Sequence, residues 1–173
     1  WTLDGNTING SAGTTVSNLN HSMNNGTPSS KGRGSFHFIN NSINNFSVGI
    51  QMGGSGYQLG ADSIFVDNNI IYANDQGINF YWAKYVEITN NEMYKSVPMG
   101  TWWSNLNNIV NNISYGIVFN DNKIRGTENA LYVYTNPTNL AFPLFAEIKN
   151  NDIETGYRGI YLRGNPDSLT GNT

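Results

Sequence analysis

The sequence contains no cysteine and no long apolar run. Without cysteine, the chain can form neither a disulfide framework nor a cysteine-based zinc site, and it carries no evidence on redox compartment. A membrane-spanning helix needs about 18 or more consecutive apolar residues. Neither such a run nor the apolar core of a signal peptide is present. The sequence therefore predicts that this stretch of chain neither spans a membrane nor carries its own export signal.

Charged residues are also scarce. They make up 12% of the 173 residues, against about 25% in ordinary soluble domains. The net charge is −3 and the isoelectric point lies near 5.2. A nucleic-acid-binding protein needs a basic face, so these values argue against nucleic acid as a partner, and against binding an anionic polymer by charge alone. His21 and His37, the two histidines, show no spacing typical of metal ligands.

Asparagine and glycine, in contrast, are abundant. The chain has 30 Asn and 19 Gly, which together exceed a quarter of its residues, and both residue types favour turns. The length suits a single domain, residues 1–173. Neither end of the sequence has the amphipathic cap that usually covers the end of a repeat array. This favours a segment of a longer chain or of an oligomer.

A short motif recurs along the chain: an apolar residue, Asn three places later, and a second apolar residue two places after that. Six copies fit: Leu3/Asn6/Ile8, Phe38/Asn41/Ile43, Phe65/Asn68/Ile70, Ile88/Asn91/Met93, Phe119/Asn122/Ile124 and Ile148/Asn151/Ile153. Eight or nine residues after each of the last five Asn, a small residue leads into a short segment: Gly49-Ile50, Gly77-Ile78, Gly100-Thr101, Ala130-Leu131 and Gly159-Ile160. The Asn residues are on average about 29 residues apart, a period typical of repeat proteins.

Each repeat contains short runs in which apolar and other residues alternate, as in FHFI, YVEI and ALYVY. This period of two is typical of β-strands. Short strands in stacked repeats predict an all-β solenoid, a parallel β-helix of about six coils spaced about 4.8 Å apart. Asn suits the corners, because it tolerates the left-handed backbone conformation and because stacked amides can hydrogen-bond to one another. The predicted ladder consists of Asn41, Asn68, Asn91, Asn122 and Asn151.

The segments FINNSI, FVDNNI, EITNNEM, FNDNKI and EIKNND, with the small-residue steps that follow them, resemble the right-handed parallel β-helix superfamily of pectate-lyase-like proteins. That superfamily includes phage tailspikes, alginate epimerases and many polysaccharide lyases and hydrolases. The resemblance implies a right-handed coil and a partner that is a polysaccharide or cell-surface glycan. It also implies an extracellular, cell-surface or virion location and, for tailspike-like proteins, a homotrimer. It does not specify a reaction, so a lyase, a hydrolase, an epimerase and a non-catalytic receptor-binding domain all stay open.

Strand alternation separates outward side chains from core ones. Phe36, Phe38, Phe65, Phe80 and Phe119 are expected in the core, and His37, Ile64, Glu87, Val118 and Glu147 are expected to point outward from the first strand of each repeat. The second strand is expected to present Gln51, Asn79, Trp102, Tyr132 and Tyr161, followed by Tyr81, Tyr134 and Arg163. Exposed Tyr and Trp rings can stack on sugars. They are equally typical of an oligomer interface, so a structural or adhesive segment is the alternative function.

Two pairs of carboxylates are candidates for catalysis. Glu87 and Glu147 share one outward column two coils apart, near the upper limit for an inverting acid/base pair. Asp67 and Asp121 are expected in an analogous relation across Asn90, although acids on a polar surface are more often only solvated. No cofactor is evident, and no segment resembles an acid-rich calcium loop. A calcium site built from backbone and carboxylate oxygens stays open for the excursions between strands, which also suit a binding face. They span residues 11–34, 53–61, 97–112 and 135–143.

Overall fold

The computed structural model describes residues 1–10, 20–21, 34–52, 61–81, 83–95, 106–111, 115–134, 145–163 and 168–169. Every regular element within these ranges is a β-strand, and all strand pairings are parallel. This confirms the expected all-β class with parallel strands. Within the same ranges, no helix has the length and apolar character needed to cross a lipid bilayer.

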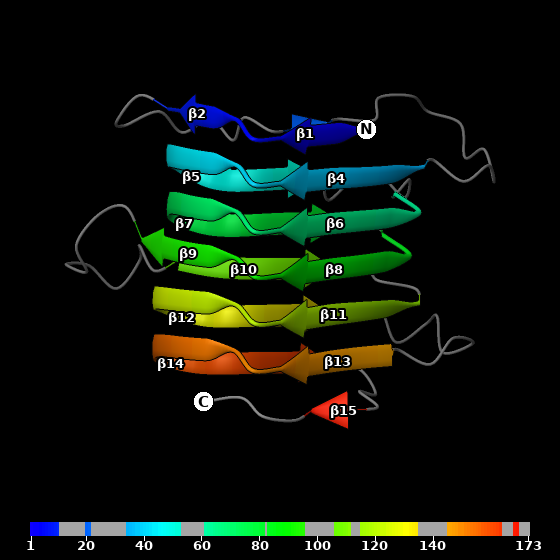
Figure 1. Cartoon of the computed structure of the whole chain (residues 1–173). Coiled ribbons are helices and arrows are strands. Elements are labelled where there is room, and N and C mark those ends of the chain that lie inside the picture. Colours follow the sequence, from blue (N-terminus) through cyan, green and yellow to red (C-terminus); the bar gives the residue numbers. More distant parts are fainter. Residues whose placement is uncertain are drawn as a thin grey trace.

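The strands form two sheets whose order follows the chain (Figure 1). The first sheet contains, in spatial order, β1 (Thr2–Asp4), β4 (Ser35–Ile39), β6 (Ser63–Asp67), β8 (Tyr85–Thr89), β11 (Gly116–Asn120), β13 (Phe145–Lys149) and β15 (Ser168–Leu169). The second contains β2 (Thr7–Asn9), β3 (Asn20–His21), β5 (Ser42–Met52), β7 (Ile70–Tyr81), β9 (Glu92–Lys95), β10 (Leu106–Asn111), β12 (Lys123–Tyr134) and β14 (Asp152–Arg163). The chain alternates between the sheets, so each repeat lies against the repeat before it.

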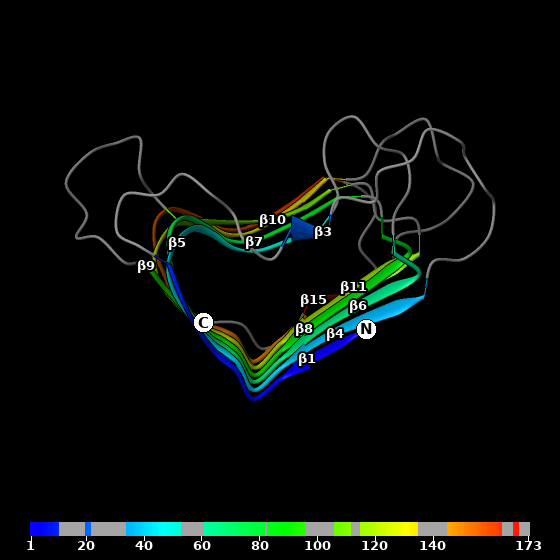
Figure 2. The ribbon, with the colours of Figure 1, turned by 90° about the horizontal axis from the view of Figure 1, so that it is seen from above.

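The cross-section has three sides (Figure 2). The first sheet forms one side. The long strands of the second sheet bend in the middle, so their first halves form the second side and their last halves the third. The pairing register shifts at these bends, between Asn44 and Val48 in β5 and between Arg125 and Asn129 in β12. Apolar side chains from all three sides fill the interior.

A ladder of buried Asn side chains runs along the corner between the first and second sides. Its members are Asn6, Asn41, Asn69, Asn91, Asn122 and Asn151. The backbone N–H and Nδ2 of each of the first five donate to Oδ1 of the next, at 2.9 to 3.1 Å. The last five are at most 2% exposed. The predicted ladder is therefore right except at Asn68, because FVDNNII satisfies the motif in two registers and the structure uses Val66, Asn69 and Ile71.

The residue before each ladder Asn makes the sharp turn at this corner. Asn40, Asn68, Asn90, Asp121 and Asn150 all have φ between 53° and 57°, and Gly5 has φ 67°. Only Gly, Asn and Asp adopt this left-handed conformation at low cost. Each corner is thus a two-residue unit, a left-handed residue followed by an inward amide.

The wrong register predicted around Asn68 also exchanges the predicted positions of two side chains, Phe65 and Ile64. Phe36, Phe38, Phe80 and Phe119 are buried, as predicted. Phe65 is only half-buried and points outward, whereas Ile64, which was predicted to point outward, is 1% exposed. Shifting a strand by one residue exchanges its two faces, so both errors follow from the same slip.

The fourth repeat departs from the predicted pattern in its second strand. Gly100-Thr101 was expected to begin this strand, but β10 lies between β7 and β12 and completes the sheet there. Val110 of β10 fills the interior position beside Phe80 and Val133. Gly100 and Thr101 lie outside the described residues. The insertion therefore falls between β9 and β10, and the motif count placed the strand too early.

A small residue follows four of the ladder Asn residues by eight positions, namely Gly49, Gly77, Ala130 and Gly159, and at Gly49 close packing in the coil interior requires it. A Cβ added at Gly49 would lie 2.5 Å from Ile71 Cγ2 and 2.6 Å from the backbone oxygen of Gly77. At Gly159, the equivalent position of the last long strand, nothing lies within 4 Å. Size is therefore restricted inside the stack and not at this outer position.

We expect Gly49→Ala to lower the free energy of unfolding by about 1 to 3 kcal/mol, because the added methyl group presses on backbone. Gly159→Ala is the matched control and should be neutral or slightly stabilising, since alanine only restricts the unfolded chain there. Urea denaturation of the two variants measures both values. Equal destabilisation of both would contradict the packing argument.

Candidate functional site

The outer face of the first sheet presents three columns of side chains, because alternate residues of each strand point outward. The first column is Ser35, Ser63, Tyr85, Gly116 and Phe145. The second is His37, Phe65, Glu87, Val118 and Glu147. The third is Ile39, Asp67, Thr89, Asn120 and Lys149. Neighbours within a column come from different repeats, so the fold gathers residues that lie far apart in the sequence.

An open groove of about 640 Å³ lies over the second and third columns. All four predicted catalytic carboxylates line it: Asp67, Glu87, Asp121 and Glu147. Neutral polar side chains of Thr89, Asn90 and Asn120 lie between them. We call this feature the acidic groove. The structure thus brings together on one face two pairs that the sequence analysis treated separately.

Glu147 is the most firmly held carboxylate of the acidic groove. Its Oε2 lies 2.8 Å from Lys149 Nζ, and its Oε1 accepts a hydrogen bond from Asn120 Nδ2 at 2.8 Å. The contact with Lys149 and then that with Asn120 lower the pKa of Glu147 below its usual value of 4.5. Glu147 is therefore ionised at neutral pH, which suits a base or a hydrogen-bond acceptor.

Glu87 lies in the same column as Glu147, with Val118 between them, as predicted. Two strand spacings separate their backbones by about 9.6 Å. Glu87 Oε2 accepts a hydrogen bond from the hydroxyl of Tyr85 at 2.8 Å. Burial and then this hydrogen bond raise the pKa of Tyr85 well above its usual value. Tyr85 therefore remains a donor that orients Glu87.

Asp67 and Asp121 do not occupy equivalent positions, contrary to the prediction. Asp67 stands two residues before its ladder Asn and points outward from β6, where its Oδ1 accepts from Thr89 Oγ1 and Asn90 Nδ2, both at 2.8 Å. Asp121 stands one residue before its ladder Asn and forms the left-handed turn. The error has the same origin as that at Asn68. Both carboxylates nevertheless line the acidic groove.

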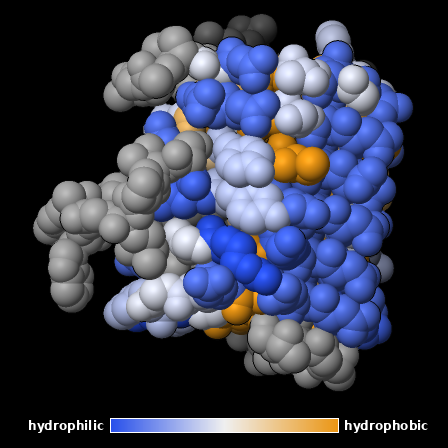
Figure 3. Space-filling model, turned by 60° about the vertical axis from the view of Figure 1, so that its left-hand side comes forward, coloured by the Kyte–Doolittle hydropathy of each residue, from blue (hydrophilic) through white to orange (hydrophobic). Residues whose placement is uncertain are grey.

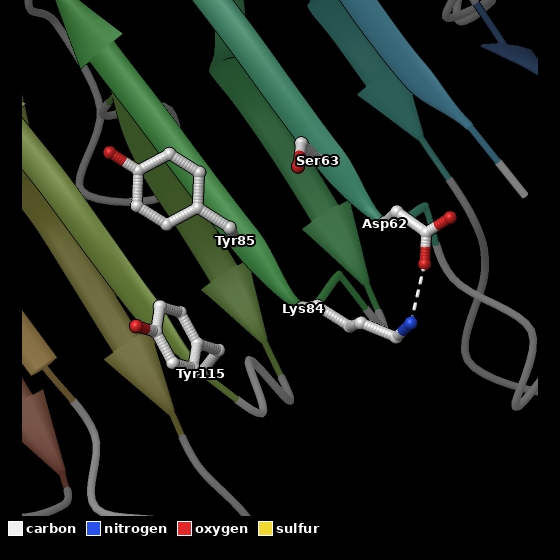
Figure 4. Close-up of a pocket in the computed structure, with 5 residues that line it drawn as sticks. All are labelled: Asp62, Ser63, Lys84, Tyr85 and Tyr115. Carbon is white, nitrogen blue, oxygen red and sulfur yellow. Dashed lines mark hydrogen bonds and ion pairs between the residues drawn. The ribbon is translucent and has the colours of Figure 1, made fainter. Parts of the chain in front are cut away.

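A second pocket, of about 710 Å³, adjoins the groove at the start of β6, β8 and β11 (Figure 4). Tyr85 and Tyr115 extend from neighbouring strands to the same side, and Lys84 Nζ lies 2.5 Å from Asp62 Oδ1 at the pocket edge. Tyr115 is 64% exposed. We call this feature the tyrosine pocket. It offers ring faces to solvent beside a compensated ion pair.

A row of rings connects the tyrosine pocket to the acidic groove. Phe65 lies 6.0 Å from Tyr85, and His37 stacks on Phe65 with ring centroids 4.6 Å apart and planes 12° from parallel. The sequence analysis assigned no function to Phe65, Tyr85 or Tyr115. A signal existed for Tyr85, because it precedes Glu87 by two residues in YVEI and so must point to the same face.

The predicted aromatic column on the second sheet is present only in part. The register places Gln51, Asn79, Ile109, Tyr132 and Tyr161 in it. β10 supplies Ile109 at the position where Trp102 was expected, and Trp102 lies outside the described residues. Tyr132 and Tyr161 stack with centroids 5.1 Å apart, and the guanidinium of Arg158 lies 4.8 Å from the Tyr161 ring.

The residues predicted two positions further along hold the expected strand positions. Tyr81 of β7 pairs with Asn111 of β10, Asn111 pairs with Tyr134 of β12, and Tyr134 pairs with Arg163 of β14. Tyr81 is partly exposed. The side chains of Tyr134 and Arg163 lie outside those that the structure describes. Their part in binding therefore stays a prediction.

A further aromatic pair, missed in the sequence analysis, lies on the side formed by the first halves of the second-sheet strands. Tyr72 and Tyr94 stack with centroids 5.0 Å apart, beside Ile70, which is 42% exposed. Figure 3 shows this side as mostly hydrophilic with a small apolar patch. Exposed rings are thus not confined to the first sheet. Those of the first sheet adjoin the acidic groove.

Among the described residues, no group of three or more His, Asp and Glu side chains is placed to hold a metal ion. The excursions considered for calcium lie almost wholly outside these residues. Comparison of the chain with family models, with curated proteins and with solved structures gave no match.

Proposed function

We propose that the chain is a right-handed parallel β-helix of about six coils, one for each member of the Asn ladder. Two observations support this proposal. The strands of each sheet follow one another in chain order, as stacked coils require. Seen from the N-terminal end, the chain runs clockwise from β1 to β5 while successive coils lie farther from the viewer, which is the sense of a right-handed helix (Figure 2).

We infer further that the outer face of the first sheet binds a polysaccharide. The observation that carries this inference is the adjacency of exposed rings, in the tyrosine pocket, to carboxylate and amide groups, in the acidic groove. Rings stack on the apolar faces of sugars, and convergent polar groups hydrogen-bond to hydroxyls. The residues that line the groove come from five successive strands of the first sheet, β4 to β13, and the corners that follow them, so the groove suits a polymer. A cell-surface glycan as ligand and an extracellular or virion location follow as parts of the same proposal.

Tyr115→Ala tests this proposal directly. A ring stacked on a sugar contributes about 1 kcal/mol, so affinity for a bound oligosaccharide should fall about fivefold. Because Tyr115 is 64% exposed, the substitution should leave the unfolding midpoint unchanged. Glycan-array screening followed by calorimetric titration measures the affinity.

Tyr72→Ala is the matched control, since it also removes an exposed ring but on another side of the coil. It should leave glycan affinity unchanged. If Tyr115→Ala instead altered the oligomeric state and left glycan affinity intact, the face would be an assembly surface. The chain would then be a structural or adhesive segment, with the homotrimer as the first arrangement to test.

Glycoside hydrolysis is the second candidate function, and the Glu87 and Glu147 positions favour it. An inverting hydrolase uses two carboxyl groups about 6.5 to 9.5 Å apart, with a water beside the base. Glu147, held ionised by Lys149, suits the base. Glu87 would supply the proton to the leaving oxygen through Oε1, the oxygen that Tyr85 does not contact. Soaking with candidate polysaccharides and assaying oligosaccharide release tests for the reaction.

A further inference from the structure

The outer face of the first sheet has an uneven distribution of charge. Two of its carboxylates have a cationic partner: Asp62 with Lys84 and Glu147 with Lys149. The partners of Glu87 and Asp67 are neutral, namely Tyr85 for the first, and Thr89 and Asn90 for the second.

Asp121, at the corner, is the third carboxylate that lines the acidic groove without a cationic partner among the described residues. In the part of the chain that the structure describes, no lysine or arginine forms an ion pair with Asp67, Glu87 or Asp121. Asp67 and Glu87 accept hydrogen bonds from neutral groups, and none of the three carboxylates has a cationic partner within the described ranges.

This imbalance restricts the chemistry of a ligand that covers the groove. A polyanion, such as a uronate or sulfated glycan, would bring further negative charge against these carboxylates. A neutral glycan would remove water from them and return only hydroxyl contacts. A ligand with positive charge compensates them as it binds, and an ammonium group can also contact the faces of the Tyr85 and Tyr115 rings.

We propose that the acidic groove and the tyrosine pocket together select an amine-bearing glycan, a polymer of hexosamine units with free amino groups. This inference rests on the proposed polysaccharide-binding function and names its ligand class. The rings contact the sugar faces, and the ammonium groups pair with Glu87, Asp67 and Asp121. The proposal assigns the groove to recognition by charge. In a hydrolase in which Glu87 carries the proton for the leaving oxygen, the charge pairing falls to Asp67 and Asp121.

The test compares three probes by calorimetric titration with the whole chain: an oligomer of β-linked glucosamine, its fully N-acetylated counterpart, and an oligogalacturonate. The glucosamine oligomer should bind at least about tenfold more tightly than the acetylated one, and its affinity should fall as salt rises, because charge pairing drives the difference. The oligogalacturonate should bind most weakly.

The double variant Asp67→Asn with Asp121→Asn removes two charges and keeps one hydrogen-bonding oxygen at each position. Asn also suits the turn at position 121, since Asn40, Asn68, Asn90 and Asn150 occupy the equivalent turns. The preference for the glucosamine oligomer over the acetylated one should fall about three- to tenfold. Glu154→Gln, at an exposed carboxylate on the second sheet, is the control and should leave the preference unchanged.

The outcomes separate this inference from the function on which it rests. Equal or tighter binding of the acetylated oligomer or the galacturonate would overturn the ligand class and leave polysaccharide binding in place. An unchanged preference in the double variant would also overturn it. Binding of none of the three, with no hit on a glycan array, would overturn the proposed function and this inference with it.

Discussion

Asn69→Leu is expected to destabilise the protein by about 3 to 5 kcal/mol, because several buried polar groups lose partners at once and each costs about 1 to 3 kcal/mol. Asn69 Oδ1 accepts from both the backbone N–H and Nδ2 of Asn41, each at 2.9 Å. Its Nδ2 donates to Phe38 O, Asp67 O and Asn91 Oδ1. Leucine has a similar volume and fills the space, so the loss reports the hydrogen bonds. Urea denaturation with a two-state fit measures it.

Asn68→Gly is the matched control one residue away. Asn68 has φ 53° and is exposed, and glycine adopts this conformation freely. We expect a change of less than about 1 kcal/mol, from the lost hydrogen bond to Asn40 and the greater freedom of the unfolded chain. A larger loss at position 68 than at position 69 would restore the register predicted from the motif and contradict the ladder described above.

If the chain cleaves a polysaccharide, Glu147→Gln should lower kcat by at least about a hundredfold, since a positioned general base contributes about 10²- to 10⁴-fold. Glu87→Gln should have a loss of similar size, because both carboxyl groups act in one step. Measuring kcat at saturating substrate separates this effect from any change in binding. Retained cleavage in both variants would move the reaction to Asp67 and Asp121.

The pH profile gives a second test of the role of Glu147. Lys149 and Asn120 lower the pKa of Glu147 below 4.5. If Glu147 is the base of a cleavage reaction, activity should therefore persist as pH falls to 4.5 and be lost only below that value. Lys149→Ala removes the larger cause of the shift, so the acidic limb of the profile should move to higher pH. An acidic limb that stays in place in this variant would show that another group titrates there.

The sequence determines most of the fold, since corner chemistry and strand alternation are both local signals. The sequence also contained a signal that would have assigned the corner at Asn69 correctly. The small residue follows its ladder Asn by eight positions at Asn41, Asn122 and Asn151. Asn69 also satisfies this count with Gly77, whereas Asn68 gives nine. At Gly49 the interior packing explains the small residue, because an added Cβ would lie 2.6 Å from the backbone oxygen of Gly77.

The position of β10 could not be predicted in this way. A surface insertion of any length can interrupt a coil at small entropic cost, so the distance from Asn91 to the next strand is not fixed by the corner. The Gly100-Thr101 step matched the motif by composition and drew Trp102 into the outward column. The strand is formed instead by LNNIVN, Leu106–Asn111, whose apolar residues do not alternate strictly.

The sequence predicted the outward positions of single residues such as Glu87 and Glu147, but it did not predict the tyrosine pocket. Glu87 and Glu147 followed from counting strands, which needs only the register. The tyrosine pocket depends on how wide the outer face is and which columns adjoin, and on Tyr115, which precedes its strand. The pocket combines side chains from three neighbouring coils, so it cannot be predicted from the sequence of any single repeat.

The Asn ladder also bears on how such a chain can change over evolutionary time. Every member presents the same acceptor to the coil before it and the same donors to the coil after it, so a corner does not distinguish which coil is its neighbour. A gene segment encoding one coil could therefore be duplicated or deleted without a mismatch at the corner. The outer face could thereby become longer or shorter by whole coils. The outward residues that contact a ligand could change independently of the corner.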